Sequence, residues 1–209
     1  MDMFSEKMEL CGISNDTEVV IVEDWFNLGG RLWWMLQYIG VSSVKVLLGG
    51  LDAWLAAGFS TEMGRAEKPQ KGKITGGFKR DWLVSYEEVQ QITQDKSKVL
   101  IDVRAPGRYR GEVEPLDTKA GHIPTAVNVF YDSFYTRTGL IELEKIEKIL
   151  DPIKKDGRKV VVYCGSGITA PIGMMAMAEV GLDTALYLGS FSDWLSYPDS
   201  LIMTGEETL

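Results

Sequence analysis

The residues best suited to chemistry lie in the stretch KVVVYCGSGITA, residues 159–170. A short apolar, β-branched run that ends at Tyr163 is typical of a buried strand. Cys164 follows it directly, a Gly-Ser-Gly turn comes next, and residues 168–180 are predicted to form a helix that opens at this turn. Backbone N–H groups converge at such a junction, and with the helix dipole they favour an anion. A thiolate is such an anion, so we expect Cys164 to be a nucleophile rather than an inert buried cysteine.

Composition restricts the classes of protein to which the chain can belong. Its 209 residues, 45% of them hydrophobic, can build one large domain or two small ones. The net charge of −8 and the pI near 4.8 argue against nucleic acid and against anionic membranes as partners. No apolar run is long enough to span a membrane, and the acidic N-terminus is not expected to be a signal peptide. Two cysteines and one histidine predict neither a disulfide framework nor a zinc site, so we expect a reducing, cytoplasmic setting without metal or cofactor.

The elements that must position Cys164 are strands that alternate with helices. Such alternation predicts an α/β fold with a mostly parallel sheet, whose functional sites lie at the carboxyl ends of the strands. Residues 61–77 are rich in Gly, Lys and Pro and lack periodicity, which is typical of a linker. The predicted strands are residues 18–22, 44–48, 99–103, 126–129, 160–163 and 185–188. The predicted helices are residues 4–11, 31–39, 51–57, 85–93 (opened by a capping box), 140–150 (stopped near Pro152), 168–180 and 192–195, with a long polar loop at 104–120.

An internal repeat links the two parts of the chain. Residues 20–54 and 161–194 share the order strand, turn, apolar helix and glycine, so that Gly40 matches Gly181 at an offset of 141. At this offset Glu23 stands in the position of Cys164, so the first copy lacks the nucleophile. About 80 residues precede the nucleophile strand in the second copy and fewer than 20 precede its counterpart in the first, which is therefore a half-unit.

Four motifs together resemble the rhodanese superfamily, specifically the two-domain thiosulfate and 3-mercaptopyruvate sulfurtransferases. They are LIDVRAPGRYRG (100–111), AGHIPTAVNV (120–129), VVYCGSGITA (161–170) and the pair LGGLDAW and LGSFSDW. The resemblance implies a parallel sheet flanked by helices, with one complete domain and a partial N-terminal copy. It also implies that residues 1–60 form a partial inactive domain, 61–77 the linker and 78–209 the catalytic domain.

The resemblance assigns roles to individual residues. Cys164 is expected to take a sulfane sulfur as a persulfide and to pass it to a thiol or to cyanide. Arg108 is expected to bind a small anionic donor, thiosulfate or 3-mercaptopyruvate, since a guanidinium suits a sulfonate or a carboxylate. The loop residues Gly165, Ser166, Gly167, Ile168 and Thr169 are expected to cradle the anion. Asp102, Arg104 and His122 are interpreted as structural, and Asp117 stands where mercaptopyruvate enzymes are expected to have a second arginine.

Two other functions compete with sulfur transfer. Phosphatases that share this fold need an arginine six positions after the cysteine, and Ala170 stands there, which leaves a phosphoryl transition state poorly stabilised. A non-catalytic rhodanese-like binding or regulatory module is the alternative that the missing half-domain favours and the intact Cys164 loop disfavours. The apolar residues of the half-unit, Trp33, Trp34 and Ile39 among them, call for a cover. A homodimer, docking on the second domain, or an upstream region would each supply it.

Overall fold

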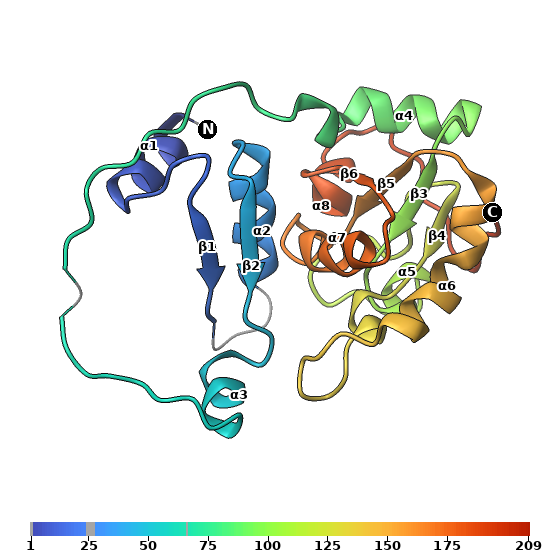
Figure 1. Ribbon diagram of the computed structural model, residues 1–209. Helices are drawn as coiled ribbons and strands as arrows, with labels where there is room; N and C mark the ends of the chain where they lie inside the picture. The colour runs from blue at the N-terminus through green and yellow to red at the C-terminus, as the bar shows by residue number, and fades with distance from the viewer. Residues whose placement is uncertain (1, 24–27, 66) are drawn as a thin grey trace. The chain divides into compact units, whose positions relative to one another are not determined.

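The computed structural model describes residues 2–23, 28–65 and 67–209 and divides into two compact units, Met1–Arg80 and Asp81–Leu209 (Figure 1). Each unit is built around its own parallel sheet. Among the residues described, none of the helices combines the length and the apolar character that crossing a membrane requires. The α/β fold with helices around parallel strands, which the alternation predicted, is confirmed.

The N-terminal unit is a two-stranded sheet with helices. β1 and β2 pair in parallel from Glu18 opposite Ser43 to Ile21 opposite Val46. α2 packs on these strands and buries Trp34 and Leu36 almost completely. The elements are α1 (Asp2–Leu10), β1 (Glu18–Ile21), α2 (Gly29–Tyr38), β2 (Ser43–Val46) and α3 (Gly50–Ala56).

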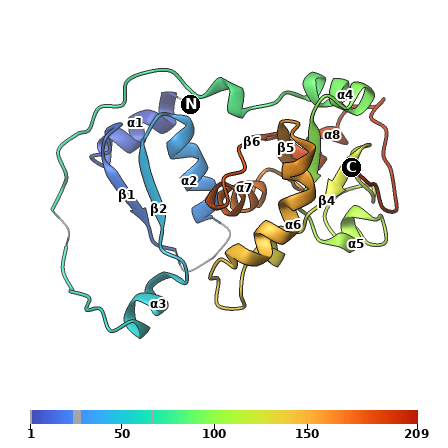
Figure 2. The same ribbon diagram turned by 45° about the vertical axis from the view of Figure 1, so that its right-hand side comes forward.

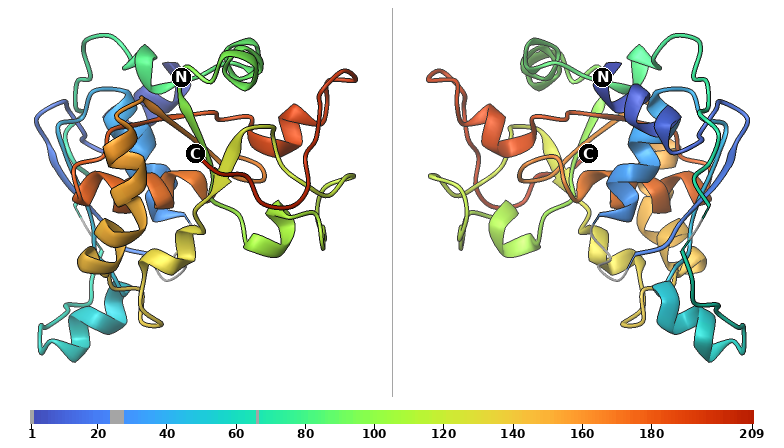
Figure 3. Two further views of the ribbon diagram at one scale, coloured as in Figure 1. Left: turned by 90° about the vertical axis from the view of Figure 1, so that its right-hand side faces the viewer. Right: turned by 90° about the vertical axis from the view of Figure 1, so that its left-hand side faces the viewer.

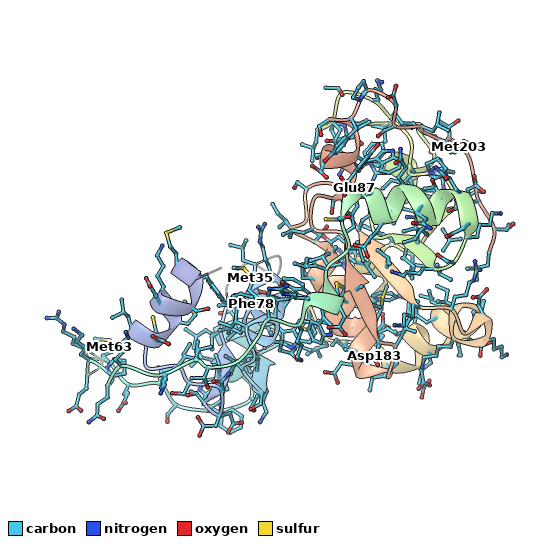
Figure 4. All side chains as sticks on the ribbon, turned by 90° about the horizontal axis from the view of Figure 1, so that it is seen from above. Met35, Met63, Phe78, Glu87, Asp183 and Met203 are labelled. Atoms are coloured by element: carbon cyan, nitrogen blue, oxygen red, sulfur yellow. The ribbon has the colours of Figure 1, made fainter. Side chains whose placement is uncertain are left out.

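The stretch predicted as a linker has no helix or strand among its described residues, yet its end is held in place. The backbone N–H of Gly72 donates to the carbonyl of Glu9, and that of Ile74 donates to the Glu9 carboxylate. Thr75 donates to the side chain of Asn15 in the same way. Phe78, labelled in Figure 4, stacks on Tyr38 with the ring centroids 5.5 Å apart. Residues 72–78 therefore belong to the packed part of this unit.

The C-terminal unit has a four-stranded parallel sheet in the order β4-β3-β5-β6. β3 and β5 are central and buried at every position, as expected for strands covered on both faces. The elements are η1 (Arg80–Trp82), α4 (Tyr86–Asp95), β3 (Val99–Asp102), α5 (Pro106–Tyr109), β4 (Ala126–Asn128), η2 (Tyr131–Phe134), α6 (Leu143–Asp156), β5 (Val160–Tyr163), α7 (Ala170–Glu179), β6 (Thr184–Leu186) and α8 (Ser190–Trp194).

Helices cover both faces of this sheet. α6 and α7 lie side by side on one face, and α5 and α8 lie on the other (Figures 2 and 3). Side chains alternate between the faces, so Leu100, Val161 and Tyr163 form a core with residues of α4 and α8 such as Val89 and Trp194. α4 opens at the predicted capping box, in which Ser85 and Glu88 bind each other's backbone N–H.

Two predictions about this unit are wrong in detail. The predicted polar loop 104–120 contains the short helix α5, which begins with Pro106, a residue suited to a first helical turn. α6 continues through Pro152 instead of stopping there and ends at Asp156, where the following Gly157 has a φ of +78° that suits a helix end. Packing explains the continuation, because the buried stripe of Ile146 and Leu150 extends to Ile153 beyond the proline.

Candidate active site

Cys164 lies at the carboxyl end of the central strand β5, with only 1% of its surface exposed. Its backbone N–H donates to Ser190 Oγ at 3.1 Å, and its Sγ lies 3.8 Å from the same oxygen. The loop then turns at Gly167, whose φ is +74° and where an added Cβ would lie 2.2 Å from the carbonyl oxygen of Leu188. Only glycine suits both demands, and this explains the glycine at this position of the loop.

The loop between Cys164 and α7 has unused backbone donors. Within the described chain, none of the five N–H groups of residues 165–169 donates a hydrogen bond to another protein atom. Gly165, Gly167 and Thr169 are buried or half-buried, and N–H groups in such places normally have partners. Consecutive donors at the opening of a helix form a concavity that suits an anion.

Arg108, predicted to bind the donor, lies beside this loop. A Cβ added to Gly165 would be 3.4 Å from both Nη atoms of Arg108, so the guanidinium is in contact distance of the residue after the thiol. The guanidinium is already engaged by two carboxylates. Its Nε donates to Glu114 at 3.0 Å, and its Nη2 donates to Asp117 at 2.9 Å.

A buried ion pair holds the strand end next to this arginine. Arg104 donates from Nε and Nη2 to the Asp102 carboxylate, at 3.0 Å and 2.6 Å to Oδ2, and both side chains are almost fully buried. Nη2 also donates to the carbonyl of Gly121, and the guanidinium lies 4.0 Å from the ring centroid of Phe191. Every group in this pair has a partner, in agreement with the structural interpretation of Asp102 and Arg104.

Glu114 joins the two arginines. It pairs with Arg104 at 3.3 Å and with Arg108 at 2.7 Å. Burial raises the pKa of the Glu114 carboxyl, but hydrogen bonds from Arg108 and from the backbone N–H of Leu116 and Asp117 outweigh it, and the net pKa is lowered. Glu114 is therefore held as a carboxylate that fixes both guanidinium groups.

His122 is packed as a structural residue. Its ring stacks on Tyr109 with centroids 3.9 Å apart, and its Nδ1 lies 2.8 Å from the Tyr109 carbonyl oxygen. Its backbone forms an antiparallel bridge with Met203, labelled in Figure 4. Among the described residues its Nε2 has no hydrogen-bond partner. Burial is the main cause of a lowered His122 pKa, and the ring is held neutral.

Sequence reasoning missed three residues of this region: Glu114, Ser190 and Ser192. Ser192 Oγ lies 2.6 Å from Asp117 Oδ1 and 2.9 Å from the carbonyl oxygen of Gly165, so its one hydroxyl proton is shared between the two acceptors and links the Cys164 loop to the loop that carries Asp117. The repeat contained a signal for Ser190. One deletion after Gly40 the offset between the copies becomes 140, so that Gly49 matches Gly189 and Gly50 matches Ser190. The two residues have nearly the same φ, +58° and +59°. No sequence signal marked Glu114 or Ser192.

Together, the fold and this geometry define an α/β protein in which a loop that begins with a cysteine and suits an anion lies at the carboxyl end of a parallel sheet. Residues 85–197 match the family described as the rhodanese-like domain. The putative thiosulfate sulfurtransferase SseB of Mycobacterium tuberculosis is 39% identical over 194 residues, which cover 90% of this chain and 67% of that protein. The chain belongs to the rhodanese-like family.

Other relatives agree with this assignment. The probable 3-mercaptopyruvate sulfurtransferase of Pseudomonas aeruginosa is 33% identical over 96% of this chain and 72% of its own length. The crystal structure of SseA from Escherichia coli, described as a rhodanese fold, matches with a TM-score of 0.75 at 28% identity, over 91% of this chain and 72% of that one. YnjE matches with a TM-score of 0.86 at 21% identity and shows the fold alone, and this chain spans 53% of it.

Proposed function

We propose that the chain is a sulfurtransferase. It moves a sulfane sulfur from thiosulfate or 3-mercaptopyruvate to a thiol or cyanide acceptor through a persulfide on Cys164. The observation that carries the proposal is the run of five N–H groups directly after the thiol, which have no hydrogen-bond acceptor among the residues that the structure describes. These groups suit the negative charge of a thiolate or a persulfide. That relatives are named sulfurtransferases supports the same reaction.

The first copy of the repeat supports this role for the loop. Glu23 stands at the position of Cys164, and its carboxylate accepts hydrogen bonds from the N–H groups of Leu28 and Gly29. At the offset of 141 these two residues match Thr169 and Ala170. In the first copy, which lacks the nucleophile, the Glu23 carboxylate thus accepts hydrogen bonds from backbone N–H groups at positions that correspond to the end of the Cys164 loop.

The chemistry consists of two displacements on sulfur. The Cys164 thiolate attacks the sulfane sulfur of the donor, and a Cys–S–S bond forms. Thiosulfate then loses its S–S bond and sulfite leaves with the electron pair, whereas mercaptopyruvate loses its C–S bond and leaves as pyruvate after taking up a proton. The acceptor attacks the outer sulfur of the persulfide, and Cys164 returns as a thiolate. The loop N–H groups stabilise the negative charge on the sulfur in both steps.

Intact mass spectrometry of the full chain after incubation with each donor tests the proposal. We expect the mass of one added sulfur, lost again on addition of cyanide with formation of thiocyanate. Cys164→Ser should abolish the gain, and Cys11→Ser should keep it, because Cys11 is exposed and follows the plain helix α1. Equal loss in both variants would overturn the assignment to Cys164, and no gain with thiosulfate, 3-mercaptopyruvate or a persulfide donor would overturn sulfur transfer.

One observation favours the non-catalytic alternative. Cys164 is nearly inaccessible, and the Arg108 guanidinium beside it is occupied by carboxylates. A binding module would leave Cys164 unmodified by both donors while remaining folded, and the mass experiment distinguishes the two functions.

We further propose that residues 1–60 are a partial, inactive rhodanese-like copy, and that the segment 61–77, whose end packs on this copy, leads to the catalytic domain. The parallel β1–β2 pair and the matched backbone of Gly50 and Ser190 support a shared origin of the two copies. Trp34 and Ile39, for which a cover was expected, are only 2% exposed. Val20 in β1 is 54% exposed and Val22 after it 53%, so an apolar face of this strand is left uncovered, and a homodimer is one cover we propose.

A further inference from the structure

Asp117 forms an ion pair with Arg108, the residue predicted to bind an anionic donor. Its Oδ2 accepts from Arg108 Nη2 at 2.9 Å, and its Oδ1 accepts from Ser192 Oγ at 2.6 Å. The Asp117 side chain is only 10% exposed and that of Arg108 only 16%. Ser192 Oγ also lies 2.9 Å from the carbonyl oxygen of Gly165, so Ser192 links this carboxylate to the residue that follows the thiol.

Carboxylates already engage two of the three nitrogens of the Arg108 guanidinium, Nε by Glu114 and Nη2 by Asp117. The connected cluster contains two guanidinium groups, Arg104 and Arg108, and three carboxylates, Asp102, Glu114 and Asp117, so the negative charges exceed the positive by one. Asp102 and Glu114 are buried more deeply than Asp117 and neutralise the two arginines by themselves. Asp117 is the surplus charge, and it lies on the side of the cluster that faces the Cys164 loop.

We propose that Asp117 is a specificity-determining residue that selects against anionic sulfur donors. This inference rests on the proposed sulfurtransferase function. An anionic donor must displace Asp117 from Arg108 or approach a site that already carries excess negative charge. Like charges at a few ångströms repel strongly where water is scarce. The class of donor that suits the site is a persulfide that is neutral or cationic at the end facing Arg108, where the Asp117 carboxylate attracts a cation.

The ranking of three donors of different charge provides the test. Thiosulfate is a dianion, 3-mercaptopyruvate a monoanion, and the persulfide of cysteamine carries a cationic ammonium group. They leave as sulfite, pyruvate and cysteamine when Cys164 takes the sulfur. The rate of Cys164 persulfide formation is followed by intact mass in the full chain, as kcat/KM for each donor at low and at high salt.

Asp117→Asn removes the charge and keeps the shape. We expect it to raise kcat/KM at least tenfold for thiosulfate, less for mercaptopyruvate, and to lower it for cysteamine persulfide, with the differences shrinking at high salt. Asp117→Glu keeps the charge, so its kcat/KM should still be highest for cysteamine persulfide and lowest for thiosulfate. Glu112→Gln is the matched control, because this exposed carboxylate in the same loop pairs with Arg110 instead.

The outcomes separate the inference from the function on which it rests. If no donor modifies Cys164 in any variant, the sulfurtransferase proposal fails. If persulfides form but Asp117→Asn changes all three donors by the same factor, or favours none, Asp117 has no part in selecting the donor. If Asp117→Asn does not fold, Asp117→Glu is used for the test. The inference is overturned if Asp117→Glu, which keeps the negative charge, reacts faster with thiosulfate than with the other two donors.

Discussion

The backbone of Ser190 has a conformation that its counterpart in the first copy reaches without strain. Its φ is +58°, whereas Gly50 at the matching position has +59°. A residue with a Cβ pays roughly 1–2 kcal/mol for this left-handed conformation, and glycine avoids that cost. The hydroxyl of Ser190 offsets part of this cost, because it donates to the carbonyl of Tyr187 at 3.0 Å and accepts from the N–H of Cys164 at 3.1 Å.

Two substitutions separate the strain from the hydroxyl. Ser190→Ala and Ser190→Gly both leave the buried Cys164 N–H without its acceptor, which costs about 1–3 kcal/mol. Only Ser190→Gly also relieves the strained backbone. We therefore expect Ser190→Gly to be close to the parent protein in its free energy of unfolding, and Ser190→Ala to be less stable than Ser190→Gly by about 1–2 kcal/mol.

Urea unfolding with linear extrapolation measures this difference. The same pair of substitutions at Ser192, in the middle of α8, is the control. Glycine should there be less stable than alanine by about 1 kcal/mol, because alanine is the better helix former. A Ser190→Ala variant as stable as Ser190→Gly would refute the reasoning, since it would mean that position 190 has no left-handed backbone to relieve.

Two further predictions concern buried titratable groups. Asp102→Asn should lower the free energy of unfolding in urea by roughly 3 kcal/mol, because it removes the short ion pair of the buried Arg104 guanidinium and leaves only the longer pair with Glu114 at 3.3 Å. Glu112→Gln, in the exposed pair with Arg110, should lower it by less than about 1 kcal/mol, and equal losses would contradict this. The pKa of His122 is lowered in the fold, so the unfolded chain takes up a proton first and stability should fall as the pH drops below about 6.5. In urea unfolding between pH 7.5 and 5.5, His122→Gln should flatten that part of the profile, and an unchanged profile would assign the effect to other groups.

The sequence predicted those features that depend on local pattern. The buried runs ending at Asp102 and Tyr163 are β3 and β5, because β-branched residues covered on both faces leave a continuous apolar signal. Pro152 misled the prediction of α6, because a local rule for helix breaking was overridden by the buried stripe that reaches Ile153. The contacts of Arg108 with two carboxylates could not be predicted, since ion pairs depend on how a loop without periodicity folds back on α5.

The hydrogen bonds that fix residues 72–75 join positions about sixty residues apart in the chain. The N-terminal unit is therefore completed by the last residues of the segment that leads out of it, and its folding during synthesis waits until residue 75 has left the ribosome. A protease that cut the exposed stretch around residues 61–65 would leave two fragments still joined by the contacts of Glu9, Ser14 and Asn15. Cleavage would then appear on a denaturing gel and leave the native mass unchanged.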